Sequence, residues 1–330
     1  MQQRKLFILL FILLSCPLIA DSSHPTPESV HKNISLFDKA MYYLYQPIAF
    51  FLPHIELRKP IYETETQYFN ARVEEDEAGI RHLVFLPRNG SQGIIDPKQP
   101  EKIISNFMKY AFLALPALGH PPEKVLFIGL GGGIMPMYLR RHYPNAQIDI
   151  VEIDKEIPKI AEEYFNFKPD PKINIYIMDG RAYVNQLEEK YDIIFSDVYD
   201  ANNIPFQFTT VEFFRQIKKH LTTDGIFAVN LANFGDNEFI SAELNTMLNV
   251  FKNCYIFACK GNTNYVPIAF ANSNATLEDL TKNAVLYNKQ KRFGIDFEQI
   301  LTTITKPKEL QVLIGPSPTI LTDDYIPVFE

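Results

Sequence analysis

The stretch that decides the fold reads Lys124-Val125-Leu126-Phe127-Ile128-Gly129-Leu130-Gly131-Gly132-Gly133. Its apolar run predicts a buried strand, and the glycines directly after it predict a tight turn that leads into a helix. Glycine lets the backbone approach a ligand closely and adopt positive φ angles, while the start of a helix offers free N–H groups. The stretch therefore predicts a nucleotide-binding turn, with Gly129, Gly131 and Gly133 as candidate ligand-contacting residues.

Strand-like and helix-like segments alternate on both sides of this turn. Strands are predicted at 148–152, 173–178, 193–197, 226–231, 255–258 and 267–271, and helices at 101–118, 135–142, 157–165, 181–187, 210–220 and 238–251. Such alternation is typical of a sheet with parallel strands and helices on both faces. We therefore expect an α/β fold with a doubly wound, mostly parallel sheet over residues 101–330.

Acidic residues follow the predicted strands at the positions where this architecture binds ligands. Glu152 ends the second strand 19 residues after Gly133, a spacing at which an acid accepts hydrogen bonds from ribose hydroxyls. A dinucleotide enzyme would share these two features. The third strand is followed by Asp179 and Gly180, and the fourth by Asp197. Two residues after Glu152, Asp154 is expected only to cap the next helix.

The segments after the third and fourth strands carry a family resemblance. Methyltransferase-type domains place an acid against the adenine amino group where this chain has Asp179. The runs Ser196-Asp197-Val198-Tyr199-Asp200 and Phe208-Thr209-Thr210-Val211-Glu212-Phe213-Phe214, and the C-terminal Leu321-Thr322-Asp323-Asp324-Tyr325-Ile326-Pro327-Val328, resemble motifs of the spermidine synthase (polyamine aminopropyltransferase) family. The resemblance covers about residues 61–330. It implies a Rossmann-like sheet of the class I methyltransferase type.

The resemblance also implies an activity and a role for each acid. The chain is expected to be a transferase of polyamine biosynthesis that binds decarboxylated S-adenosylmethionine or S-adenosylmethionine as co-substrate. It would transfer an aminopropyl group to a small-molecule amine. By this likeness Glu152 holds the ribose, Asp179 and Gly180 hold the adenine, and Asp197 and Asp200 hold the reacting amine, with Asp197 as the catalytic base.

Three departures from the family pattern keep two alternatives open. The glycine turn lacks the family's Asp, Tyr68-Phe69 replaces Tyr-Gln, and Phe107-Met108-Lys109 replaces Tyr-(His/Gln)-Glu. The nucleoside end of the family site is thus better preserved than the polyamine end. The alternatives are a methyltransferase that uses S-adenosylmethionine and a non-catalytic exported binding protein that kept the fold.

Composition limits the classes of partner. The formal net charge is −7, and Lys and Arg form no run longer than a pair, so the chain is not expected to bind nucleic acid. The seven scattered histidines and three cysteines form no metal-ligand spacing, so no metal is expected. Homodimerisation is left open by the sequence.

The chain before the sheet divides into three parts. Residues 21–60 are interpreted as a linker followed by an aromatic amphipathic helix, and residues 61–100 as a small β-hairpin subdomain. Residues 1–20 begin with Arg4 and Lys5, continue with an apolar run, and end in Ala20 before polar residues. This layout indicates a signal peptide or membrane anchor. Leu13-Leu14-Ser15-Cys16 also resembles a lipoprotein box. The protein is expected to be exported or anchored in a bacterial envelope, with a cytoplasmic location as the alternative.

The N-terminal interpretation predicts that the chain leaves the cytoplasm through residues 1–20. Fractionation of cells that express the full chain, followed by N-terminal sequencing, should recover it in the envelope or periplasm, either processed near Ala20 or held in the membrane. An intact Met1 on a freely soluble cytoplasmic protein would contradict the prediction.

Overall fold

A computed structural model describes residues 58–87, 90–199, 204–232, 237–261, 263–272, 274–290, 292–315 and 319–325. The predictions for residues 1–57 and for Asp200 lie outside this part of the chain. All described residues belong to the compact unit Asn33–Glu330.

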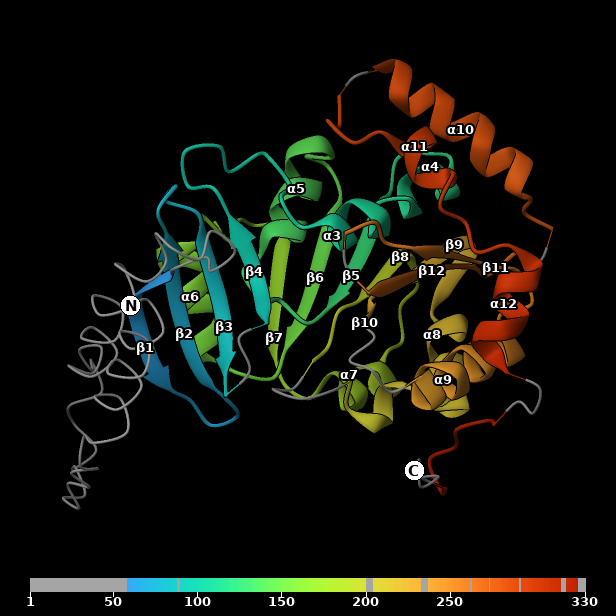
Figure 1. Ribbon diagram of the computed structural model, residues 1–330, viewed down its shortest axis with the longest axis horizontal. Helices are drawn as coiled ribbons and strands as arrows, with labels where there is room; N and C mark the ends of the chain where they lie inside the picture. The colour runs from blue at the N-terminus through green and yellow to red at the C-terminus, as the bar shows by residue number, and fades with distance from the viewer. Residues whose placement is uncertain are drawn as a thin grey trace, which may run out of the picture. The chain divides into compact units, whose positions relative to one another are not determined.

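The first described residues form a small antiparallel sheet (Figure 1). Its strands, in spatial order, are β1 (Arg58–Glu65), β2 (Asn70–Asp76), β3 (Arg81–Leu86) and β4 (Ser91–Ile95). The predicted hairpin is β2–β3. Asp76 closes its turn because its carboxylate accepts from the N–H groups of Ala78 and Ile80, and Gly79 supplies the positive φ of +84°. The subdomain is thus a four-stranded sheet with the predicted hairpin at its centre.

The main sheet is mostly parallel. Its parallel strands are β5 (Lys124–Ile128), β6 (Gln147–Glu152), β7 (Ile173–Ile177), β8 (Tyr191–Ser196) and β9 (Leu221–Val229), in the spatial order β9-β8-β5-β6-β7. Beyond β9 lie the antiparallel strands β12 (Asn264–Phe270), β10 (Leu231–Ala232) and β11 (Cys254–Ala258). The predicted fold class is confirmed.

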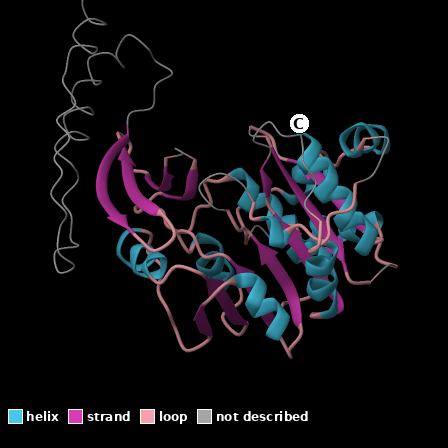
Figure 2. Ribbon diagram, turned by 90° about the horizontal axis from the view of Figure 1, so that it is seen from below, coloured by secondary structure: helices cyan, strands magenta, loops and turns pink. Residues whose placement is uncertain are grey.

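Helices cover both faces of the main sheet (Figures 1 and 2). Side chains alternate along β5, so Val125 and Phe127 join one apolar core and Leu126 and Ile128 join another. The first core includes residues of α3 (Asn106–Ala111), α4 (Ala114–Leu118), α5 (Ile134–His142), α6 (Glu156–Tyr164) and α10 (Leu277–Gln290). The second includes residues of α7 (Gly180–Gln186), α8 (Val211–Lys219) and α9 (Asn237–Val250).

Two helical regions differ from the sequence prediction. The single helix predicted at 101–118 is two short helices, α3 and α4, because Pro116 has no N–H to donate to the carbonyl of Phe112. After β12 the chain adds α10, α11 (Phe297–Leu301) and α12 (Pro307–Ile314), which the sequence analysis did not predict.

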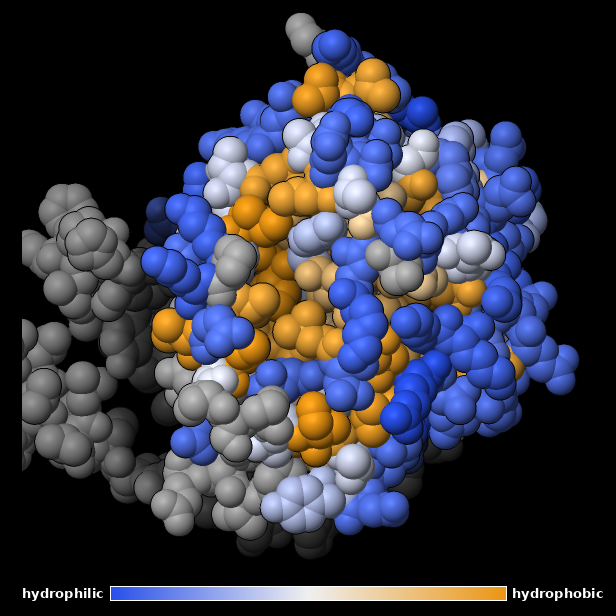
Figure 3. All heavy atoms as spheres, turned by 90° about the vertical axis from the view of Figure 1, so that its right-hand side faces the viewer, coloured by the Kyte–Doolittle hydropathy of each residue, from blue (hydrophilic) through white to orange (hydrophobic). Residues whose placement is uncertain are grey.

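The surface around these last helices is mixed in polarity. Figure 3 shows apolar side chains gathered in the middle of the face that carries α10 and α12, framed by polar ones. Within the ranges that the structure describes, no helix combines the length and the apolarity needed to cross a bilayer.

Backbone hydrogen bonds continue past the carboxyl ends of the parallel strands. The N–H of Gly129 donates to Val151, that of Asp197 donates to Ile128, and that of Asn230 donates to Ser196. The segments after β5, β8 and β9 therefore leave the sheet in register and lie side by side at one edge. This edge is where an open α/β sheet binds ligands.

Candidate functional site

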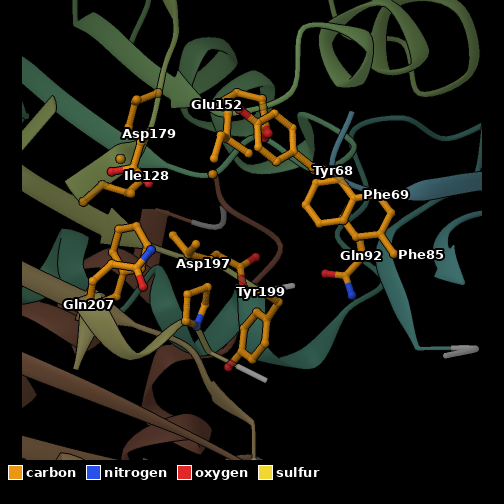
Figure 4. Close-up of a pocket in the computed structure, with 18 residues that line it drawn as sticks. Tyr68, Phe69, Phe85, Gln92, Ile128, Glu152, Asp179, Asp197, Tyr199 and Gln207 are labelled. Carbon is orange, nitrogen blue, oxygen red and sulfur yellow. The ribbon is translucent and has the colours of Figure 1, made fainter. Parts of the chain in front are cut away.

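A cavity of about 200 Å³ opens at the carboxyl edge of the main sheet (Figure 4). We call it the edge cavity. Its lining residues are Tyr68, Phe69, Phe85, Gln92, Ile128, Gly129, Gly131, Val151, Glu152, Ile153, Asp179, Gly180, Asp197, Val198, Tyr199, Pro205, Gln207 and Phe208. Six of the eight predicted site residues are thus brought together. Of the other two, Gly133 does not line the cavity, and Asp200 lies outside the described residues.

The glycine turn requires glycine because the backbone passes close to other chain segments. A Cβ added to Gly129, where φ is +93°, would lie 2.4 Å from the carbonyl oxygen of Asp197, and one added to Gly131 would lie 2.6 Å from that of Gln92. Gly133 has a positive φ as well, but its Cβ would meet the ring of Phe167 at 2.6 Å. Gly133 therefore allows helix α5 to begin against Phe167, while Gly129 and Gly131 form the floor of the cavity.

Glu152 connects the glycine turn to the end of β6. Its Oε2 accepts from the N–H of Leu130 at 3.0 Å, and its Oε1 accepts from the N–H of Asp154 at 3.0 Å. Burial raises the pKa of this carboxyl, and the backbone N–H donors oppose that shift. Each carboxylate oxygen can accept a second hydrogen bond, so the pair is suited to the two vicinal hydroxyls of a ribose. Asp154 accepts from the N–H of Glu156, the first residue of α6, although the N-cap position itself is Lys155.

Asp179 is the N-cap of α7 and lies across the cavity from the aromatic residues of the small sheet (Figure 4). Its Oδ1 accepts from the N–H of Ala182 at 2.8 Å, which fixes the direction of the side chain. Next to it, Gly180 has no Cβ, and one would lie 2.8 Å from Ile128 and about as close, at 3.2 Å, to Phe208. Gly180 therefore packs directly against these two apolar side chains, and all three line the cavity beside the Asp179 carboxylate, a setting that suits a flat purine with an exocyclic amine.

Asp197 lies at the end of β8 and points into the edge cavity (Figure 4). Its Oδ1 accepts from the side-chain amide of Asn230 at 2.9 Å. Burial raises the pKa of Asp197 to about 6, and the hydrogen bond from Asn230 acts in the opposite direction. A carboxylate with this pKa is mostly ionised at neutral pH, and it is a stronger proton acceptor than an exposed aspartate.

Sequence reasoning missed Asn230, which orients Asp197. Asn230 follows β9 and is held from two sides, since its Oδ1 accepts from the amide of Asn264 at 2.7 Å and its carbonyl accepts from the hydroxyl of Tyr199 at 2.5 Å. This arrangement makes the Asn230 side-chain nitrogen the donor toward Asp197. A signal was present, because Asn230 lies in the predicted strand 226–231 at the same sheet edge as Asp197.

The small sheet supplies an aromatic wall that sequence reasoning did not place at the site. Phe69 stacks on Phe85 with ring centroids 4.2 Å apart and planes 6° from parallel, and Tyr68 lies beside them (Figure 4). An adjoining cavity of about 20 Å³ is lined by Met108 together with Gln92 and Asp197, among other residues. Two of the residues that depart from the family pattern, Phe69 and Met108, therefore line these cavities.

Another residue that departs from the family pattern has a different position. Lys109 lines neither cavity, and its Nζ donates to Asn106 at 3.2 Å. Across the described parts of the chain, no cluster of three or more His, Cys, Asp or Glu side chains could hold a metal ion.

Comparisons with known proteins agree with this geometry. The family model for the spermine/spermidine synthase domain matches residues 107–274. The chain is 28% identical over 274 residues to the polyamine aminopropyltransferase of Vibrio vulnificus, covering 81% of this chain and 89% of that protein. It is 32% identical over 197 residues to the probable polyamine aminopropyl transferase of Bifidobacterium longum, covering 58% of this chain and 42% of that protein.

Solved structures show the same fold. The probable spermidine synthase from Corynebacterium glutamicum ATCC 13032 superimposes with a TM-score of 0.62 at 19% identity, covering 81% of this chain and 98% of that chain. Human methyltransferase-like protein 13 in complex with SAH gives a TM-score of 0.53 at 26% identity, covering 57% of this chain and 93% of that chain. The family model matches just over half of this chain, including the residues around Glu152, Asp179 and Asp197. The chain therefore belongs to the spermine/spermidine synthase family, a family of transferases.

Proposed function

We propose that the chain transfers the aminopropyl group of decarboxylated S-adenosylmethionine to a small primary amine. The observation that carries the proposal is the position of Asp197, a half-buried carboxylate with a raised pKa in the same cavity as Glu152 and Asp179. Relatives named polyamine aminopropyltransferase support it. One spermidine synthase of the same fold is described in complex with the transition state analogue AdoDATO.

The donor would be held by its nucleoside half. Glu152 offers carboxylate oxygens to the ribose hydroxyls, and Asp179 offers its second oxygen to the adenine amino group. Ile128 and Phe208 line the cavity beside Gly180. Fixing the nucleoside also fixes the carbon that will react, so a bound amine attacks it in a favourable geometry. Such positioning contributes several kcal/mol in well-oriented systems, on the order of 7–11 at most.

The reacting amine must lose a proton before it can attack. A nitrogen–carbon bond forms at the aminopropyl carbon next to the sulfonium, and the carbon–sulfur bond breaks with its electron pair staying on sulfur. The sulfur becomes a neutral thioether, so the leaving group needs no acid. The proton released by the ammonium goes to Asp197, whose Oδ1 is held by Asn230 and whose Oδ2 we assign to the amine.

The raised pKa of Asp197 matters for this proton transfer. An alkylammonium has a pKa of about 10.4 and an ordinary aspartate one of about 3.9, so the proton would move uphill by more than six pKa units. With Asp197 at about 6 the difference falls to roughly four units, each of about 1.4 kcal/mol. Burial of Asp197 thus removes about a third of the cost of deprotonating the amine.

A methyltransferase is the second candidate function. The chain is 30% identical over 159 residues to the human eEF1A lysine and N-terminal methyltransferase, covering 44% of this chain and 22% of that protein. Such an enzyme would use Glu152 and Asp179 in the same way but take S-adenosylmethionine as donor. Titration with both nucleosides separates the two, because a donor site for aminopropyl transfer should prefer the decarboxylated form.

Removing the Glu152 carboxylate should weaken nucleoside binding. Glu152→Ala leaves two ribose hydroxyls without charged acceptors, each worth about 1.5–3 kcal/mol, so the Kd should rise at least tenfold. Calorimetry on Glu152→Ala and on Glu152→Gln, which keeps the size of the side chain, measures the loss. The exposed Glu162→Ala serves as the control. Unchanged affinity in a folded Glu152 variant would refute the assignment.

Removing the Asp197 charge should slow the transfer and leave donor affinity nearly unchanged. Asp197→Asn keeps the shape but accepts no proton, so single-turnover rates should fall by about 10²–10⁴-fold. Wild-type kcat/KM should fall about tenfold per pH unit below about 6, because Asp197 is then protonated, and this limb should vanish in the variant. The exposed Asp224→Asn is the matched control. Near wild-type turnover by Asp197→Asn on a proven acceptor would sink the proposal.

The aromatic wall predicts that putrescine is a poor acceptor or none. Its second ammonium would lose hydration beside Phe69 and Met108, which cannot pair with it. We expect n-butylamine, which lacks that second charge, to be used at least as well, and Phe69→Gln to improve the use of putrescine. Product analysis by mass spectrometry makes the comparison. Efficient formation of spermidine by the wild-type chain would contradict this prediction.

A further inference from the structure

We propose that Asp323, in the C-terminal segment, is a positioning residue for the donor. Through Arg181 and Thr210 it holds the loop Pro205–Phe208 against the edge cavity. We call these three side chains the C-terminal clasp. The proposal rests on the proposed function in one respect, namely that the edge cavity binds a nucleoside.

Arg181 is the centre of the clasp. It directly follows Gly180 in α7, and its side chain is only 13% exposed. Its Nη1 donates to the carbonyl of Gln207 at 2.9 Å and to the hydroxyl of Thr210 at 3.2 Å, while its Nη2 pairs with Asp323 at 2.6 Å. The guanidinium of Arg181 therefore joins the start of α7 to the loop Pro205–Phe208 and to the C-terminal segment.

Thr210 gives the clasp its second connection. Its side-chain hydroxyl donates to Oδ1 of Asp323 at 2.6 Å and accepts from the N–H of Phe213 at 3.3 Å, where it is the N-cap of α8. Both oxygens of Asp323 are thus used, Oδ1 by Thr210 and Oδ2 by Arg181. A carboxylate with two charge-assisted or short hydrogen bonds fixes its partners more firmly than a single surface ion pair does.

The backbone around Asp323 is itself anchored. Leu321 is fully buried, its N–H donates to the hydroxyl of Thr246 at 2.8 Å, and its carbonyl accepts from the N–H of Val211 at 2.9 Å. The N–H of Asp323 donates to the Glu212 carboxylate at 3.0 Å. Asp323 is exposed, with a side chain that is 43% accessible, but these backbone contacts place its carboxylate with respect to α8 and α9.

The loop that the clasp holds forms a wall of the cavity. Pro205, Gln207 and Phe208 line it, and the ring of Phe208 packs edge-on against Phe213 with centroids 5.3 Å apart. A Cβ on Gly180 would lie 3.2 Å from the same ring, so Phe208 packs against Gly180, and both line the part of the cavity where we place the adenine. If Asp323 is lost, Arg181 loses its anion, and the position of the Pro205–Phe208 wall in the cavity is no longer fixed.

The test combines donor affinity with amide exchange in the loop. Asp323→Ala, Arg181→Ala and their double variant are compared with Asp324→Ala, an exposed neighbour outside the clasp. The ligand is 5′-methylthioadenosine, the nucleoside product of the proposed transfer. We expect a five- to tenfold higher Kd for each single variant and at most a twofold further loss in the double variant. Exchange at 206–210 should be faster, and kcat at saturating donor should stay within twofold.

Several outcomes would overturn the clasp. The first is an unchanged Kd and unchanged amide exchange in Asp323→Ala. The second is a set of affinity losses in the single variants that multiply in the double variant. The third is a lower melting temperature with an unaltered Kd, which indicates structural support alone. Exchange is measured without ligand, so it judges the clasp separately from the proposed function. A wild-type chain that binds no nucleoside would refute the proposed function, and unchanged loop exchange in Asp323→Ala would refute the clasp even then.

Discussion

The hydrogen bond from the N–H of Leu130 to the carboxylate of Glu152 is the constraint on which the site depends. It joins the glycine turn after β5 to the end of β6, and it fixes the carboxylate that faces the cavity. The glycine turn also lies against the chain after β8, because Gly129 passes close to the carbonyl of Asp197. Asp197 is therefore positioned by the same glycine turn that holds Glu152 in the cavity.

Much of the cavity around the glycine turn, Glu152 and Asp179 could be predicted from the sequence, because these residues lie close together along the chain. An apolar strand, a glycine turn and an acid at the end of the next strand specify each other through the geometry of one βαβ unit, and the edge cavity contains Glu152, Asp179 and Asp197 together. The antiparallel end of the sheet was less clear. The length of the segment that connects two strands decides their relative direction. Segment 259–263 between β11 and β12 is too short for a parallel crossover, so these two strands are antiparallel.

The rest could not be predicted because it depends on tertiary contacts. Helix α10 buries only Leu280 and Ala284, so its apolar periodicity is weak. The stack of Phe69 on Phe85 and the chain from Asn264 through Asn230 to Asp197 join segments far apart in the sequence. The two ends of the proposed site also differ from each other. The part that would hold the nucleoside follows the family, whereas the wall near the acceptor is aromatic.

The proposed function requires that this cavity bind the decarboxylated donor and pass its aminopropyl group to an amine deprotonated by Asp197. The most direct test incubates the full chain with decarboxylated S-adenosylmethionine or S-adenosylmethionine and a panel of primary amines, then identifies the products by mass spectrometry. We expect aminopropylated amine and 5′-methylthioadenosine from the decarboxylated donor, and loss of both products in Asp197→Asn. Methylated acceptor and S-adenosylhomocysteine from S-adenosylmethionine, with no product from the decarboxylated donor, would contradict the proposed function.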